Sequence, residues 1–354
     1  MIDQDIGTVL QERIRTAQRE RIPLCVRGGD SKAFYGREVK GEALDVAGHC
    51  GIVRYEPTEL VITARAGTPL QVIEQALGAH NQMLAFEPPH YGDSATLGGT
   101  IACNFSGPRR AWSGAARDFV LGCRLVNGNG DILSFGGEVM KNVAGYDVSR
   151  LMCGALGTLG VLLEVSLKVL PRPEAETTLS LQVSDRQALI KLHDWAQQPL
   201  PLSATCHDGS NLYVRVSGAH GAVNAARKLI GGDELPDGAS FWTRLREQQS
   251  GFFSTQQPVW RLSLASDTSP PPLEGKWLYE WGGALRWLVS DVSPASVRAA
   301  AGAAGGHAVL FRGGDRAGPV FHPLPDALSA VHKKLKRAFD PDGIFNPGRM
   351  YPDI

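Results

Sequence analysis

The sequence has no Cys-x-x-Cys pair, no net charge and no long apolar run. Its six cysteines are widely spaced in a chain of 354 residues, which argues against disulfide staples and against a zinc ribbon or an iron–sulfur cluster held by this chain. Lys plus Arg equals Asp plus Glu at 36 each, so no net field attracts nucleic acid or an anionic membrane surface. We therefore expect no metal site, no nucleic-acid partner and a reducing compartment.

Nothing in the chain approaches the roughly 18 consecutive apolar residues of a membrane helix. The most apolar stretch, residues 156–170, is interrupted by Glu164 and Lys168. The charged, amphipathic start over residues 1–20 is not a secretory signal. We expect a cytoplasmic protein without a transmembrane segment, peripheral at the inner membrane only through partner proteins.

The order of the predicted elements indicates an α+β protein. Apolar spacing predicts a helix over 69–77, and the turn residues 127–131 between two apolar runs predict a hairpin. The prolines at 171 and 173 mark the end of a first domain, 1–173. Strands then alternate with helices in a second domain, 174–324, like a split β-α-β cap of the ferredoxin-like kind. An amphipathic helix opens the C-terminal segment, 325–354.

A first glycine-rich loop follows the short apolar strand at residues 23–26. In this loop Gly28 and Gly29 can take positive φ and turn successive N–H groups toward one anion. Ser31 adds a hydroxyl donor, and Arg27 and Lys32 add positive charge. This pattern predicts a pyrophosphate site.

A second loop of small residues with many donors lies about 65 residues further on. Small side chains let a flat or anionic ligand approach the backbone. A purely structural turn remains an alternative for either loop alone, but two in this order favour a dinucleotide. A Rossmann nicotinamide site is disfavoured, because no Gly-x-Gly-x-x-Gly follows the first strand. The second loop comprises Ser94, Ala95, Thr96, Leu97, Gly98, Gly99 and Thr100, and continues through Asn104, Ser106 and Gly107.

Five segments together resemble the vanillyl-alcohol-oxidase (PCMH-type) family of FAD-binding proteins. They are residues 27–31, 95–100, 145–147, 154–161 and 339–349. The resemblance spans residues 22–173 and returns at 325–351. Within the family, residues 31–36 and 141–147 are similar to the FAD-binding subunits of bacterial glycolate oxidases.

The resemblance implies a two-subdomain FAD-binding domain, an α+β cap, and FAD lying extended across the first domain. The pyrophosphate would lie on Gly28 to Ser31, with the flavin ring facing residues 95–99 and 104–107. The tail would fold back over the same lobe. The resemblance also places Gly67 close to the cofactor and includes Asn346 through the terminal motif. It places Gly157, Gly160 and Val161 near the adenosine or ribose. Helix-to-strand packing is an equal alternative for Gly157 and Gly160.

The chain also departs from the family. Members that bind FAD covalently through the first loop have a histidine there, whereas this chain has Asp30, so we expect non-covalent FAD. Asp30 and a pyrophosphate would repel each other, so Asp30 must point away or be offset by the loop cations. The histidine-rich substrate motif of the D-lactate and glycolate dehydrogenase branch is not found in the sequence.

Only weak candidates remain for catalysis. Arg109, Arg110 and Arg117 could bind a substrate carboxylate, and His90 or Tyr146 could act on a proton. Capping or phosphate-side roles are equal alternatives for them.

Three hypotheses follow for the function. In the preferred one, the chain binds FAD in a complex that oxidises glycolate, a small 2-hydroxy acid, to glyoxylate. A sister FAD-containing subunit has the glycolate site, and electrons pass to an iron–sulfur subunit. The alternatives are a free-standing FAD-dependent 2-hydroxy-acid dehydrogenase or oxidase, and an assembly subunit that has lost its flavin.

Overall fold

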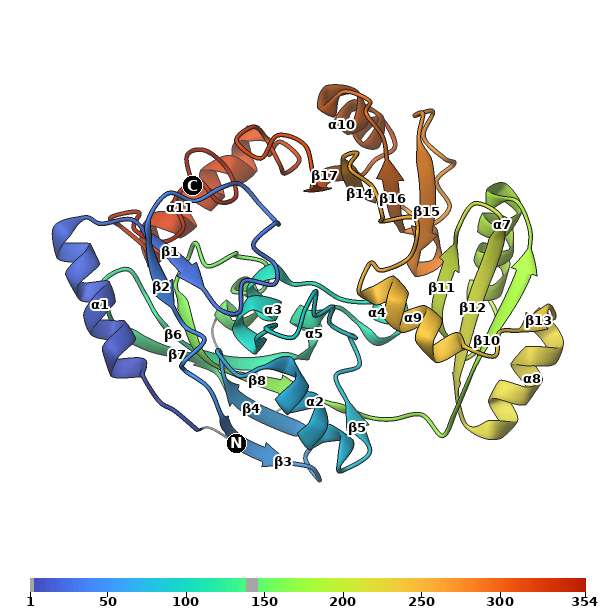
Figure 1. Cartoon of the computed structure of the whole chain (residues 1–354), viewed down its shortest axis with the longest axis horizontal. Helices are drawn as coiled ribbons and strands as arrows, with labels where there is room; N and C mark the ends of the chain where they lie inside the picture. Colours follow the sequence, from blue (N-terminus) through green and yellow to red (C-terminus); the bar gives the residue numbers. More distant parts are fainter. Residues whose placement is uncertain (1–2, 138–145) are drawn as a thin grey trace.

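The computed structural model describes residues 3–137 and 146–354, and it has the expected α+β architecture. An N-terminal lobe and a cap lie side by side, and the C-terminal helix packs back on the N-terminal lobe (Figure 1). In the described part of the chain no helix has the length and apolar character needed to cross a membrane.

The N-terminal lobe is built on a five-stranded antiparallel sheet with strand order β3-β4-β8-β6-β7. Its central strand, β8, reads as a nearly continuous apolar run and is buried along most of its length, as a strand covered on both faces should be. A parallel pair, β1 and β2, lies apart from this sheet and leads into the first glycine loop. The bounds are α1 (Gly7–Glu20), β1 (Leu24–Arg27), β2 (Glu42–Asp45), β3 (Ile52–Glu56), β4 (Val61–Arg65), α2 (Leu70–Gly78), β5 (Gln82–Met83), α3 (Leu97–Cys103), α4 (Arg110–Ser113), α5 (Ala116–Phe119), β6 (Val120–Val126), β7 (Ile132–Gly136), α6 (Val148–Leu151), β8 (Val161–Lys168) and β9 (Leu170–Pro171).

The predicted hairpin is confirmed as β6 and β7, which pair from Gly122 with Gly136 to Val126 with Ile132. The side chain of Asn127 organises the turn, because its Oδ1 accepts hydrogen bonds from the main-chain N–H groups of Asn129 and Asp131.

The cap contains an eight-stranded sheet that consists of two units with the same strand order. The first unit, β10-α7-β11-β12-α8-β13, has the order β13-β10-β12-β11, and the second, β14-β15-β16-α10-β17, has the mirrored order β15-β16-β14-β17. Both match a βαββαβ unit, but a loop with three prolines replaces the first helix of the second. The bounds are β10 (Ala175–Gln182), α7 (Asp185–Ala196), β11 (Leu202–His207), β12 (Asn211–Gly218), α8 (His220–Ile230), β13 (Asp233–Glu234), α9 (Gly238–Arg246), β14 (Val259–Ser263), β15 (Lys276–Glu280), η1 (Trp281–Gly283), β16 (Leu285–Val289), α10 (Pro294–Ala303) and β17 (His307–Arg312).

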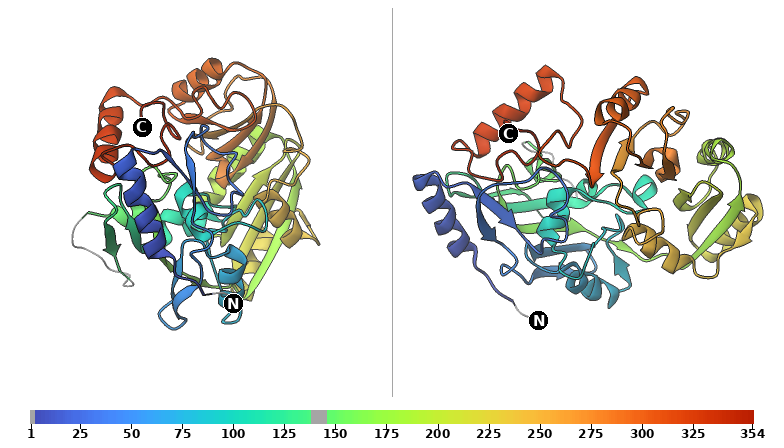
Figure 2. Two further views of the ribbon diagram at one scale, coloured as in Figure 1. Left: turned by 60° about the vertical axis from the view of Figure 1, so that its left-hand side comes forward. Right: turned by 45° about the horizontal axis from the view of Figure 1, so that its top comes forward.

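The tail returns to the N-terminal lobe through α11 (Asp326–Phe339) and the segment after it (Figure 2). Leu24 donates its N–H to the carbonyl of Ile344, and Asn346 donates its N–H to the carbonyl of Leu24. Ile344 and Phe345 belong to the apolar core of the N-terminal lobe. The cap has one core of its own and a second that also takes in Tyr35, Phe105 and Leu156 of the N-terminal lobe. On this basis we propose to keep the domain division at residues 1–173, 174–324 and 325–354.

A buried charge network joins the two lobes. Glu87 of the N-terminal lobe accepts from Arg109 Nε at 3.2 Å and pairs with Arg215 Nη2 of the cap at 2.8 Å. Arg109 also pairs with Glu176 of the cap. Burial acts to raise the pKa of Glu87, but the two guanidinium groups outweigh it and hold that pKa below its ordinary value. The network therefore fixes the cap against the lobe.

Candidate functional site

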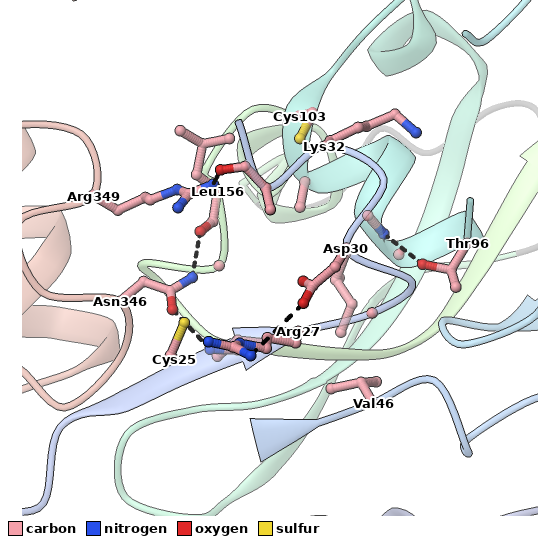
Figure 3. Close-up of a pocket in the computed structure, with 18 of the residues that line it drawn as sticks. Cys25, Arg27, Asp30, Lys32, Val46, Thr96, Cys103, Leu156, Asn346 and Arg349 are labelled. Carbon is pink, nitrogen blue, oxygen red and sulfur yellow. Dashed lines mark hydrogen bonds and ion pairs between the residues drawn. The ribbon is translucent and has the colours of Figure 1, made fainter. Parts of the chain in front are cut away.

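A cavity of about 390 Å³ opens between β1, the first glycine loop, the start of α3 and the tail (Figure 3). It brings together segments that are more than 300 residues apart in the sequence. Thirteen predicted residues line it: Arg27, Gly28, Gly29, Asp30, Ser31, Lys32, Thr96, Gly98, Gly99, Gly157, Gly160, Val161 and, from the tail, Asn346.

The first loop presents its backbone to this cavity. Within the described residues, the main-chain N–H groups of residues 28–32 donate to no acceptor of the chain. Four of these residues, all except the exposed Asp30, are buried or half-buried. Main-chain N–H groups in such positions normally have a partner, so their lack of one indicates a place for a ligand rich in acceptors.

The glycines of this loop serve a different purpose from the one expected. Positive φ was expected at Gly28 and Gly29, but the left-handed residue is Asp30, at φ 53°. The glycines are required by the close approach of the second segment. A Cβ on Gly28 would lie 2.5 Å from Thr96 Oγ1, and one on Gly29 would lie 1.4 Å from the carbonyl oxygen of Ser94. The two glycine-rich segments therefore touch.

The second segment is not a donor loop, which corrects the expectation from sequence. Leu97 opens α3, and Thr96 is its N-cap, with Oγ1 accepting from the N–H of Gly99 at 3.3 Å. The N–H of Gly98 donates to Ala66, and that of Thr100 donates to the carbonyl of Thr96. These amides are already used by the start of the helix, so this segment contributes small-residue surface instead of N–H donors.

Asn346 bridges two walls of the cavity. Its side chain is buried, its Oδ1 accepts from the N–H of Val26 at 2.8 Å, and its Nδ2 donates to the carbonyl of Leu156 at 2.7 Å. Gly157 has a φ of 69° and leaves room for this amide, because a Cβ there would lie 2.7 Å from Asn346 Nδ2. The neighbouring Gly160 packs on the carbonyl of Val126 and also lines the cavity. Both roles considered for this glycine, close packing and a place beside the cofactor, are therefore compatible with the structure.

The charges around the cavity are mostly cationic. Arg27 Nη1 lies 3.8 Å from Asp30 Oδ2, so a loop cation offsets the one acid of the loop (Figure 3). Lys32 turns away, because its buried ammonium donates to the carbonyl of His90 at 3.2 Å and to Ser31 Oγ at 3.3 Å. Burial lowers the pKa of Lys32 and that of Arg349, which lines the cavity from the tail.

The other predicted cofactor residues lie behind the cavity wall and hold it in place. Gly67 packs against main-chain carbonyls after β2, and Ser94 Oγ donates to the carbonyl of Gly29. Ala95 and Leu97 are buried in the core. Asn104 ends α3 at φ 52°. Ser106 and Gly107 face the cap instead, where they line a much smaller cavity.

None of the catalytic candidates lines the 390 Å³ cavity. His90 Nε2 is 3.1 Å from Glu74 Oε1, and Arg109 belongs to the network between the lobes. Tyr146 is 97% exposed. Arg110 stacks on Trp281, and the remaining arginine, Arg117, is on the surface. Most of the predicted 141–147 motif lies outside the described residues.

The small cavity between the lobes has a volume of about 30 Å³ and is surrounded by packed aromatic rings. The centroids of Tyr35 and Phe105 are 4.7 Å apart, and those of Phe105 and Phe311 are 5.4 Å apart. Burial raises the pKa of Glu280 on its wall to about 7.

Several residues that line the 390 Å³ cavity were not predicted as site residues. They include Cys25, Cys103, Met152, Leu156, Arg316 and Arg349. Arg349 stands in the terminal motif, three residues after Asn346, and that spacing was a usable signal. No motif in the sequence around Arg316 indicates a site residue, because only the tertiary fold brings its loop to the cavity.

Comparisons with known proteins agree with this geometry. Residues 8–136 match the family model described as FAD binding domain. The chain is 51% identical over 350 residues to the glycolate oxidase subunit GlcE of Escherichia coli (strain K12), with 99% of each protein covered. It is also 29% identical over 212 residues to the glycolate oxidase subunit GlcD of Bacillus subtilis (strain 168), covering 52% of this chain and 45% of that protein.

Among solved structures, 4-ethylphenol oxidase from Gulosibacter chungangensis superposes with a TM-score of 0.70 at 14% identity, covering 99% of this chain and 89% of that one. This likeness establishes the shared fold. The near full-length identity to GlcE establishes more: the chain belongs to the family of the glycolate oxidase subunit GlcE, and residues 8–136 are its FAD binding domain.

Proposed function

We propose that the 390 Å³ cavity holds FAD, with the pyrophosphate on the N–H groups of residues 28–32. The observation that carries this proposal is the run of five main-chain N–H groups without an acceptor in the described chain, beside two glycines that have no room for a Cβ. A pyrophosphate supplies several strong acceptors to such a group of amides.

The surrounding residues suit the rest of the cofactor. The apolar wall of Val26, Met152 and Leu156 suits the flat parts of a dinucleotide, and Asn346 keeps two of its segments at a fixed separation. Arg27 offsets the charge of Asp30 beside the phosphates. When bound, the flavin supplies the two-electron redox chemistry that amino-acid side chains lack.

We propose that the FAD is not covalently attached. Among the described residues no histidine lines the cavity. Burial raises the pKa of Cys103 to about 11, so this thiol stays protonated and is a poor nucleophile. Acid precipitation of the holoprotein should leave the flavin in the supernatant, and a flavin that stays with the precipitated protein would contradict the proposal.

We further propose that the protein serves as a subunit of a glycolate oxidase complex in the cytoplasm, peripheral at the inner membrane through its partners. In this complex a sister flavoprotein subunit oxidises glycolate to glyoxylate, and electrons pass to an iron–sulfur subunit. The near full-length similarity to GlcE supports the complex. The division of labour rests on the sequence, which has neither the histidine-rich substrate motif nor cysteine ligands for an iron–sulfur cluster.

The division of labour is tested by mixing the purified holoprotein with glycolate under anaerobic conditions and following the flavin absorbance. We expect no bleaching with this chain alone, and bleaching when the co-purified partner subunits are present. Rapid bleaching by the chain alone would refute the division of labour and favour a free-standing dehydrogenase. Purification of a colourless protein that takes up no added FAD would refute the cofactor assignment itself.

A further inference from the structure

A second cleft lies in the cap, at the joint between the two βαββαβ units. Within the described residues, strands β11 and β15 join the units through two residue pairs, Cys206 with Glu280 and His207 with Tyr279. Figure 1 shows the two halves of the sheet meeting where β11 and β15 come together. Beyond these pairs, the turn after β11 and the start of β15 border a cavity of about 530 Å³. Joints between structural units are common places for ligand sites.

The walls of this cleft are apolar and aromatic. Phe241 and Leu245 come from α9, Phe252 comes from the loop after α9, and Trp277 and Leu278 come from β15. Leu245 and Leu278 are buried and form its floor, whereas the three aromatic residues are only half-buried. Exposed aromatic surface of this kind suits a flat apolar group.

The polar groups of the cleft favour an anion. Arg244 and Lys276 are exposed on its rim, and within the described part of the chain neither forms an ion pair. The one acid that lines the cleft, Asp208, keeps its charge while its carboxylate accepts from the N–H groups of Ser210 and Asn211, so two cations face one acid. The Oγ of Ser250, on the wall, is buried without a partner in the described chain.

We propose that this cleft binds a small aromatic carboxylate, with the ring between Phe241, Phe252 and Trp277 and the carboxylate on Arg244 and Lys276. The site is distinct from the FAD cavity, because the two cavities share no lining residue. The volume lies within the roughly 300 to 1,000 Å³ of ligand pockets, and it suits a molecule larger than glycolate.

The cleft also has a physical connection to the N-terminal lobe. Leu245 lines both the cleft and the small cavity between the lobes. Directly after α9, Glu247 accepts through its carboxylate from the N–H groups of His90 and Tyr91, at 3.1 and 2.8 Å. A ligand against α9 therefore contacts an element that holds the FAD-binding lobe.

The test is a calorimetric titration of the FAD-loaded protein with 2-naphthoate, and with the uncharged 2-naphthamide as the matched probe. We expect 2-naphthoate to bind more tightly, and R244Q/K276Q to weaken it by about tenfold while 2-naphthamide binding is unchanged. The control R186Q/K228Q removes the same two charges from exposed helix positions outside the cleft and should leave the affinity unaltered. Ser250→Ala should weaken binding without lowering stability, because the hydroxyl has no partner in the described chain.

Three results would overturn the proposal. They are equal affinity for the acid and the amide, equal loss in the two double variants, or no heat of binding at millimolar 2-naphthoate. FAD content serves as the folding check in every sample, so a failure here is distinguishable from a failure of the cofactor assignment.

Discussion

Replacement of Asn346 by alanine should destabilise the protein and empty the FAD cavity. The change removes the partner of two main-chain groups, the N–H of Val26 and the carbonyl of Leu156. A buried group left unpaired costs about 1 to 3 kcal/mol, and we take the lower end for each because both border a cavity that water can enter. Alanine at the observed φ of 40° adds about 1 kcal/mol, so the total is about 3 kcal/mol.

Urea unfolding of the apoprotein measures this loss, and fluorescence titration measures FAD affinity. Asn346→Gly should recover about 1 kcal/mol of stability relative to the alanine variant, because glycine tolerates a left-handed backbone. It should not recover FAD binding, since the amide that joins the walls is still missing. Asn129→Ala, on an exposed turn of the same lobe, is the control. A loss for Asn346→Ala no larger than that of the control would refute the reasoning.

Three further predictions concern glycine spacing and buried acids. Gly29→Ala should abolish FAD binding, because its Cβ would lie 1.4 Å from the Ser94 carbonyl oxygen, whereas Gly221→Ala, with nothing within 4 Å, should bind FAD normally in the same titration. Glu87→Gln should lower the free energy of unfolding at pH 7 by about 1.5 to 3 kcal/mol, since it removes one of the two carboxylates shared by Arg109 and Arg215 and leaves only Glu176. The folded-state pKa of Glu87 is below its ordinary value, so urea titrations should show the wild type losing this advantage only as the pH falls through that lowered pKa. Glu280 has a folded pKa of about 7, above its unfolded value, so wild-type stability should fall as the pH rises from about 4.5 through 7. Glu280→Gln should flatten that slope and stabilise the protein by up to about 3 kcal/mol at pH 8; an unchanged slope would contradict the assignment.

Local patterns in the sequence predicted much of the fold. The helix predicted at 69–77 is α2, Leu70–Gly78, and the hairpin predicted around residues 127–131 is the pair β6 and β7. The apolar spacing of these elements is clear, and the tertiary contacts favour the same secondary structure as the local sequence does. The repeat within the cap could not be predicted, because its two units share strand order and not sequence, and because a loop replaces one helix.

The sequence predicted which residues line the cavity more accurately than it predicted what each residue does there. Glycines 28 and 29 were selected for backbone freedom, yet what they provide is close approach to Ser94 and Thr96. A position needs glycine either for a positive φ or for the lack of a Cβ, and the residue that packs against it decides which. For Gly29 that residue is Ser94, which is 65 residues away in the sequence. Donor capacity was likewise assigned to Gly98 and Gly99, because sequence does not show that α3 begins there and uses those N–H groups itself.

The wall formed by the tail has a consequence for biosynthesis. Lys336 donates to the carbonyls of Thr158 and Phe345, and the strand that begins at Leu24 takes its last partners from residues 344 and 346. During translation, the glycine loop therefore leaves the ribosome more than 300 residues before the segment that completes its surroundings. Until then one side of the N-terminal lobe stays open. At the site we propose, FAD binding therefore requires a chain synthesised through this segment, because Asn346 and Arg349 complete the cavity.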